Sequence, residues 1–126
     1  MSKYVMIISL CFLFACKEEN TPTTPDDLLS QMSAINDQIE ALISTSCSTT
    51  SQCMSTAYGA KACGGPIKYL IHSTNMDLQK FNELVAQYNN LNAQYNEETG
   101  VYSDCSIVTK TEVECVSGNC QEVVAN

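Results

Sequence analysis

The sequence predicts an α+β fold, in which two amphipathic helices pack on a small antiparallel sheet and three disulfides staple the structure. Apolar residues recur at three- and four-residue spacings in two separate segments. Polar and apolar residues alternate near the C-terminus, and six cysteines are spread between these elements. A chain of this length allows one small folded domain, expected over residues 26–126.

The first helix is expected over residues 25–44. Thr24 is a suitable N-cap, Pro25 fits the first helical position, and the two aspartates that follow complement the positive end of the helix dipole. The apolar stripe that follows is Leu28, Met32, Ile35, Ile39 and Leu42. The helix precedes every disulfide cysteine, so the sequence leaves open whether it packs on the domain.

The second helix is expected over residues 75–98, with Thr74 or Asn75 as its cap and Gly100 just beyond its end. Its stripe is Leu78, Phe81, Leu84, Val85, Tyr88, Leu91 and Tyr95. Either stripe could serve as a coiled-coil seam. The runs are short and lack a consistent charge pattern at the flanking positions, so an intramolecular core is favoured.

The remaining segments predict strands. Residues 52–58 are a possible strand, and residues 67–72 are a short apolar run that is also expected to be one. Cys63-Gly64-Gly65-Pro66, between the two, predicts a tight turn. The C-terminal β region, about 105–124, comprises a strand over 105–109 and a hairpin that turns at Ser117-Gly118-Asn119. In the first hairpin strand Val113 and Cys115 share one face, and Glu112 and Glu114 share the other.

The N-terminus has the pattern of a targeting signal. Lys3 precedes about ten mostly apolar residues, too few to span a membrane, and these end in Leu13-Phe14-Ala15-Cys16. This stretch resembles the lipobox of a bacterial lipoprotein, which is read by the type II signal peptidase. The resemblance implies that residues 1–15 are removed and that Cys16 carries acyl chains such as palmitate, which anchor the protein to a membrane.

Lysine rather than aspartate follows Cys16. By the same resemblance this favours the outer membrane, with the protein facing either the periplasm or the cell surface. Residues 16–25 contain two prolines and no large apolar residue, so they are expected to form an extended tether.

The charge balance excludes one class of function. The chain has 14 acidic residues, six lysines, no arginine and a net charge of −8. A nucleic-acid partner needs a basic face that displaces counterions, so no nucleic acid is expected as a ligand.

An oxidising compartment and an even number of cysteines favour three disulfides among Cys47, Cys53, Cys63, Cys105, Cys115 and Cys120. Zinc binding is the alternative, but there is no Cys-x-x-Cys pair and only one histidine. Six cysteines allow fifteen pairings. A Cys63–Cys105 bond would bracket the second helix, and the other four would then join the 47–53 segment to the C-terminal hairpin.

Catalytic motifs are absent from the sequence. His72 is the sole histidine, and its neighbour Ser73 would point to the opposite face of a strand, where it could not act as a nucleophile for His72. We therefore predict no catalytic residue, no metal site and no cofactor.

The segments Cys63-Gly64-Gly65-Pro66-x-x-Tyr69 and Cys115-x-x-Gly118-x-Cys120 resemble those of small, uncharacterised, cysteine-rich bacterial proteins that are secreted or lipid-anchored. The resemblance covers residues 47–121 and implies no activity.

The leading functional hypothesis is a non-enzymatic binding module with a protein partner. Its candidate contact residues are Tyr58, Tyr69 and Tyr102, because tyrosine is common at interfaces. The alternative, which is favoured for all three, is packing in the core. One alternative is a small inhibitor of a periplasmic or host hydrolase that presents the loop at 59–66. A second alternative is an enzyme whose site includes His72.

Overall fold

The structure is a computed structural model that describes residues 23–123. The predicted signal peptide (1–15), the lipidation site Cys16 and most of the predicted tether lie outside the described residues. The described part is α+β, as predicted. Its elements are α1 (Pro25–Leu42), the 3₁₀ turn η1 (Thr50–Gln52), β1 (Cys53–Tyr58), β2 (Lys68–Ser73), α2 (Leu78–Thr99), β3 (Glu112–Val116) and β4 (Asn119–Val123).

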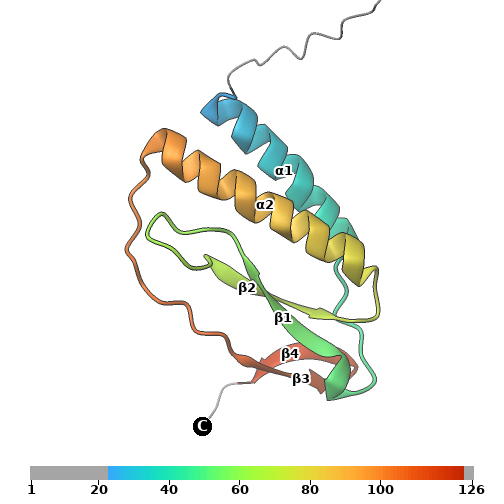
Figure 1. The fold of residues 1–126 in the computed structure, drawn as a ribbon. Coiled ribbons are helices and arrows are strands. Elements are labelled where there is room, and N and C mark those ends of the chain that lie inside the picture. Colours follow the sequence, from blue (N-terminus) through green and yellow to red (C-terminus); the bar gives the residue numbers. More distant parts are fainter. Residues whose placement is uncertain (1–22, 124–126) are drawn as a thin grey trace, which may run out of the picture.

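The elements form three layers (Figure 1). Helices α1 and α2 lie side by side and cover one face of the β1–β2 ribbon, and the β3–β4 hairpin lies on the other side of that ribbon. The long segment after α2 runs down one side of the molecule to reach β3. This arrangement places the hairpin at the end of the domain opposite the helices.

Helix α1 begins as the sequence predicts. The Thr24 hydroxyl accepts a hydrogen bond from the backbone N–H of Asp27 at 3.2 Å, and the Asp27 carboxylate accepts one from the Thr24 N–H at 3.1 Å. This reciprocal capping box satisfies two backbone donors at the helix start. The Thr24 hydroxyl also donates to the Asp27 carboxylate at 2.8 Å, and this bond, together with the one from the Thr24 N–H, lowers the pKa of Asp27. The helix ends at Leu42, two residues before the predicted end.

The predicted cap of α2 is wrong. Strand β2 extends to Ser73, and the Ser73 hydroxyl accepts a hydrogen bond from the Asn75 N–H, so these residues form a turn. Asp77 caps the helix instead, because its carboxylate accepts a hydrogen bond from the Lys80 N–H at 3.0 Å. The helix ends at Gly100, whose φ of 60° is left-handed, as expected for this position.

The core lies between the helices and the β1–β2 ribbon. Its buried residues are Ile39, Tyr58, Phe81, Leu84 and Val85. Ile39 comes from the predicted stripe of α1, and the last three come from the stripe of α2. Helix α1 therefore packs on the domain through its apolar face, which settles a question that the sequence left open.

The strands form two separate antiparallel ribbons rather than one sheet. Cys53 is paired with Ser73 at the open end of the β1–β2 ribbon, and Cys115 is paired with Cys120 in the β3–β4 ribbon. The predicted strand at 105–109 is wrong, because this segment is irregular. Cys105 has a φ of 54°, which a strand does not allow, and the Lys61 ammonium donates hydrogen bonds to Asp104 and Ser106 on either side of it.

Three disulfides join the layers. Cys47 is bonded to Cys115 and Cys53 to Cys120, with Cα–Cα distances of 5.9 and 5.4 Å. Both bonds attach the β3–β4 hairpin to the segment around β1, as the sequence reasoning expected. The third bond joins Cys63 to Cys105 at a Cα–Cα distance of 5.6 Å, and it ties the segment after α2 to the turn before β2.

Candidate functional site

The only histidine is enclosed by the core. His72 and Ser73 are both 0% exposed, and the ring of His72 packs against Phe81 at 4.5 Å between centroids. One ring nitrogen, Nε2, is hydrogen-bonded to the Thr56 hydroxyl at 2.8 Å, and Nδ1 lies 3.3 Å from the carbonyl oxygen of Ser73. A carbonyl can only accept, so Nδ1 carries the proton and Nε2 accepts from Thr56. The ring thus has a structural role within the described domain.

Burial lowers the pKa of His72, and this predicts a pH-dependent stability. Well above the ordinary histidine pKa of about 6.5, the ring is neutral in both the folded and the unfolded state and adds no pH dependence. Below that value the unfolded chain gains a proton that the folded chain resists, so the free energy of unfolding falls by up to about 1.4 kcal/mol per pH unit. The fall ends once the pH passes below the folded-state pKa.

We expect His72→Gln to remove this dependence. Urea unfolding of both proteins between pH 7.5 and 4.5 measures it, and carboxylates that titrate lower contribute equally to both curves. If the free energy of unfolding depends on pH in the same way for both proteins, the His72 ring is not desolvated in the folded state.

The three tyrosines proposed as contact residues differ in their surroundings. Tyr58 is buried and stacks on Tyr88 at 4.2 Å, and its hydroxyl donates a hydrogen bond to Asn36. The prediction that Tyr58 is a contact residue is therefore wrong. Tyr69 is half-buried, Tyr102 is almost fully exposed, and both remain predictions.

The loop at 59–66 is held firmly. Three asparagines of α2 hydrogen-bond its backbone: Asn89 accepts from the Gly59 N–H, Asn92 accepts from the Ala60 N–H, and Asn96 donates to the Ala60 carbonyl. The Lys61 ammonium is engaged by Asp104 and Ser106. The exposed tip is Ala62-Cys63-Gly64-Gly65. It offers only small side chains to an enzyme pocket.

Three sulfur atoms lie close together, as in a metal site. Those of Cys47, Cys53 and Cys120 are within 4.8 Å of one another. All three belong to disulfides, whereas metal ligation requires thiolates. The proximity follows from two adjacent disulfides at the base of the hairpin.

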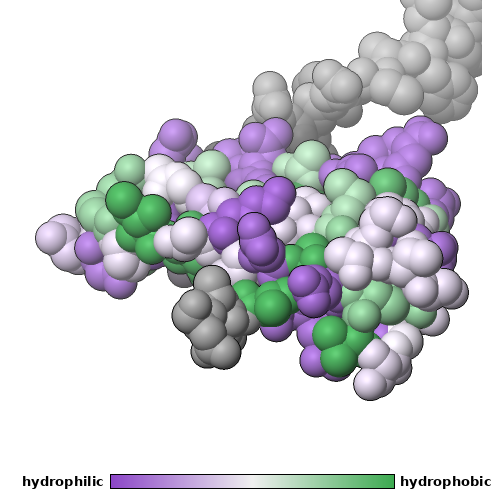
Figure 2. All heavy atoms as spheres, turned by 90° about the horizontal axis from the view of Figure 1, so that it is seen from below, coloured by the Kyte–Doolittle hydropathy of each residue, from purple (hydrophilic) through white to green (hydrophobic). Residues whose placement is uncertain are grey.

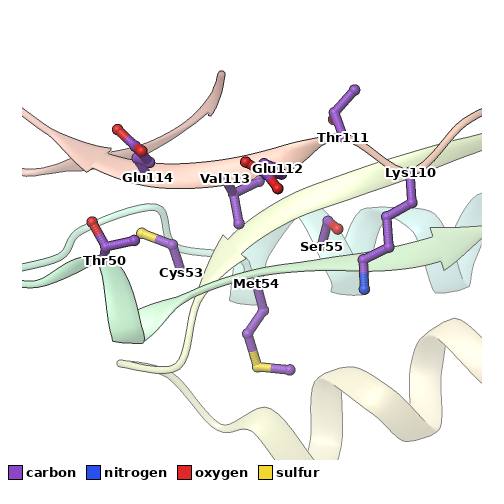
Figure 3. Close-up of a pocket in the computed structure, with 9 residues that line it drawn as sticks. All are labelled: Thr50, Cys53, Met54, Ser55, Lys110, Thr111, Glu112, Val113 and Glu114. Carbon is purple, nitrogen blue, oxygen red and sulfur yellow. The ribbon is translucent and has the colours of Figure 1, made fainter. Parts of the chain in front are cut away.

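A groove of about 510 Å³ lies between β1 and the chain segment that leads into β3 (Figure 3). We call it the edge groove. Its lining residues are Thr50, Cys53, Met54, Ser55, Lys110, Thr111, Glu112, Val113 and Glu114.

The edge groove contains one buried, unpaired polar atom. Ser55 is only 8% exposed, and its hydroxyl has no hydrogen-bond partner within the described residues. In Figure 3 the side chain points from β1 toward the side of the groove that β3 forms. Burying a hydroxyl without a partner costs about 1–3 kcal/mol, so an atom that supplied the missing hydrogen bond would be stabilised there.

The rim of the edge groove is charged. Lys110 reaches across from the segment before β3 toward β1, while Glu112 and Glu114 lie on β3 (Figure 3). In Figure 3 the side chain of Glu114 points away from β1, so Lys110 is the charge that enters the groove. Within residues 23–123 the one ion pair joins Lys61 to Asp104, and Lys110 takes no part in it.

Sequence reasoning found only part of this groove. It placed Glu112 and Glu114 together on one face of a strand, and the burial pattern of β3 confirms the alternation. It missed Ser55, Met54 and Lys110, because no local pattern marks them and they come from segments more than 50 positions apart.

No protein-family model, no curated protein and no solved structure matches the chain. Neither of the two helices in the described part of the chain is long and apolar enough to cross a membrane.

Proposed function

We propose that the protein is a lipid-anchored outer-membrane lipoprotein whose folded domain is a non-enzymatic binding module, with the edge groove as its ligand site. The anchor is inferred from the resemblance of Leu13-Phe14-Ala15-Cys16 to a lipobox. Lys17, directly after the cysteine, supports the outer membrane.

One observation carries the binding role, namely the unpaired hydroxyl of Ser55 at the buried side of the groove. Buried polar groups are nearly always hydrogen-bonded in native proteins, so an exception inside a groove is a candidate contact for a ligand. The groove is lined by polar, charged and apolar groups together. These include the Ser55 hydroxyl, the charges of Lys110 and Glu112, and the thioether of Met54. No group in it is arranged as a nucleophile with an adjacent base, which supports binding rather than catalysis.

A single experiment tests both parts of the proposal. A photo-reactive phenylalanine analogue replaces Met54, which lines the groove and is 43% exposed. The matched control replaces Leu29 on α1, which is 44% exposed and lies outside the groove. Cells of the native host are irradiated, the membrane fraction is extracted, and intact mass spectrometry is applied.

We expect a chain that starts at Cys16 and carries acyl groups, together with a discrete adduct from position 54 but not from position 29. An unmodified N-terminus would overturn the anchor. Equal adducts at both positions, or none at either, would overturn the groove as the ligand site.

A further inference from the structure

The two disulfides that hold the β3–β4 hairpin lie beside each other. The sulfur atoms of Cys47, Cys53 and Cys120 come from both bonds and are all within 4.8 Å of one another. We call these three atoms the sulfur cluster. A thiolate exchanges with a disulfide by attacking one of its two sulfurs. A thiolate of the cluster that is expelled from one bond is therefore next to a sulfur of the other bond.

Cys115 and Cys120 can form a disulfide within the hairpin. The two residues lie opposite each other in the β3–β4 ribbon. The Cys115 N–H donates to the Thr50 hydroxyl. The Cys120 N–H donates to the carbonyl oxygen of Thr45. Both N–H groups are used outside the ribbon, so this is a non-hydrogen-bonded pair, in which the two Cα atoms are about 4.5 Å apart and both side chains are on one face. A disulfide spans Cα separations of about 4.4–6.8 Å, so the ribbon accommodates a Cys115–Cys120 bond.

The same four cysteines therefore have two possible pairings. In the observed pairing, both bonds join the hairpin to the segment around β1. In the alternative pairing, a Cys47–Cys53 bond lies inside that segment and a Cys115–Cys120 bond lies inside the hairpin. Noncovalent contacts alone would then hold the hairpin, and among the residues of β3 and β4 only Cys120 is buried. The alternative pairing should thus release the hairpin from the domain.

An external thiol can reach one of the two bonds through the edge groove. Cys47 and Cys120 are only 7% and 4% exposed. Cys53 is partly exposed and lines the groove. Figure 2 shows the molecule from the hairpin side, where hydrophobic and hydrophilic residues are interspersed and form no broad apolar patch. A water-soluble thiol can approach such a surface, and Cys53 is the residue of the sulfur cluster that it can contact.

We propose that a thiol switches these four cysteines between the two pairings, and that the alternative pairing releases the hairpin and opens the edge groove. The groove opens because β3 forms one of its sides. The inference goes beyond the proposed binding function and does not depend on it, since the exchange needs no ligand in the groove.

The exchange takes three steps. The external thiolate attacks the Cys53 sulfur, forms a mixed disulfide there and expels the Cys120 thiolate. The Cys120 thiolate attacks the Cys115 sulfur on the neighbouring strand, which forms the Cys115–Cys120 bond and expels the Cys47 thiolate. The Cys47 thiolate attacks the Cys53 sulfur, which forms the Cys47–Cys53 bond and expels the external thiolate. Each step breaks one S–S bond and forms one, so the switch consumes neither an oxidant nor a reductant.

A tryptic digest made without reduction distinguishes the two pairings. Cleavage after lysine leaves the two hairpin cysteines together in peptide 111–126 and their present partners together in peptide 18–61. The observed pairing joins these peptides into one cross-linked species, whereas the alternative pairing leaves them separate, each with an internal disulfide. The oxidised full chain is incubated with a substoichiometric amount of a small monothiol, quenched with acid, labelled with N-ethylmaleimide in denaturant and digested.

We expect the two separate, internally bonded peptides to increase severalfold over a sample without thiol. The Cys63–Cys105 bond joins peptides 62–68 and 81–110, and this cross-linked species should stay constant. Hydrogen exchange of the hairpin amides should become faster in the same samples, and that of both helices should not. The inference is overturned if no internally bonded peptides form, or if the Cys63–Cys105 bond is lost in equal proportion.

Two single variants test the sulfur cluster without added thiol. Cys115→Ser leaves Cys47 as a free thiol inside the cluster, and the matched variant Cys105→Ser leaves Cys63 as a free thiol outside it. In the first variant we expect N-ethylmaleimide to label Cys120 as well as Cys47, because exchange with the neighbouring bond moves the free thiol. In the second variant the label should stay on Cys63. A label confined to Cys47 in the first variant would contradict the exchange.

Discussion

Replacing Cys47, Cys53, Cys115 and Cys120 together by serine is expected to release the β3–β4 hairpin and to lower the free energy of unfolding by about 4 kcal/mol or more. The Cys47–Cys115 and Cys53–Cys120 bonds close loops with sequence separations of 68 and 67. Loops of this length lose much entropy in the unfolded chain when they are closed, which accounts for the size of the effect.

The hairpin has little else to hold it. A two-stranded hairpin is marginal by itself, and among the residues of β3 and β4 only Cys120 is buried. Its other hydrogen bonds to the domain include two backbone bonds, from Cys47 to Gly118 and from Cys120 to Thr45. Two more involve side chains: the Cys115 N–H donates to the Thr50 hydroxyl, and the Thr45 hydroxyl donates to Asn119. Urea unfolding measures the stability, and hydrogen exchange of the hairpin amides measures its release.

Cys63→Ser combined with Cys105→Ser is the control. This bond closes a loop with a separation of 42, for which chain entropy predicts a loss of similar size, about 4 kcal/mol. It does not touch the hairpin, so the hairpin amides should stay protected. If those amides stay protected in the four-serine protein as well, noncovalent contacts are enough to hold the hairpin on the domain. Because β3 forms one side of the edge groove, the four-serine protein should also lose the photo-crosslinked adduct at position 54.

Truncating Phe81 is expected to cost about 3–5 kcal/mol. Phe81 is 0% exposed and lies at the centre of the core, where it touches His72 of β2 and packs with Ile39 of α1. Alanine would leave a cavity that the surrounding helices and strands, tied by disulfides, cannot easily close. The measurement is urea unfolding of Phe81→Ala at pH 7.5.

Leu29→Ala is the matched control for this truncation, because Leu29 is a partly exposed apolar residue of α1 outside the core. We expect it to cost less than about 1 kcal/mol. If Phe81→Ala lowers the free energy of unfolding by no more than Leu29→Ala does, the core must relax to fill the cavity.

Local chemistry explains most of the successful predictions. Thr24 and Pro25 mark the start of α1, and Gly100 marks the end of α2, because capping and left-handed backbone depend on the residue itself. The apolar stripes identified Ile39, Phe81, Leu84 and Val85 as core, because helical periodicity places such residues on one face.

The failures have equally physical causes. Residues 105–109 have the composition of a strand, but the Cys63–Cys105 disulfide and the hydrogen bonds of Lys61 hold their start in a non-extended backbone. Tyr58 is one of three candidate contact residues, but it follows the favoured alternative of core packing, because its ring stacks on Tyr88 where β1 faces α2. Asp77 caps α2 in place of the earlier candidates, because β2 extends to Ser73.

The sequence by itself determined the fold class, the apolar faces of both helices and the alternation of Glu112 with Val113 in the hairpin. These follow from covalent geometry and from periodicities of a few residues. Only the tertiary structure decided that α1 packs on the domain, that the strands form two ribbons, and that Ser55 lies unpaired beside Lys110. The reason is that the edge groove joins residues from distant segments, and their proximity depends on the disulfides and on the packing of the whole chain.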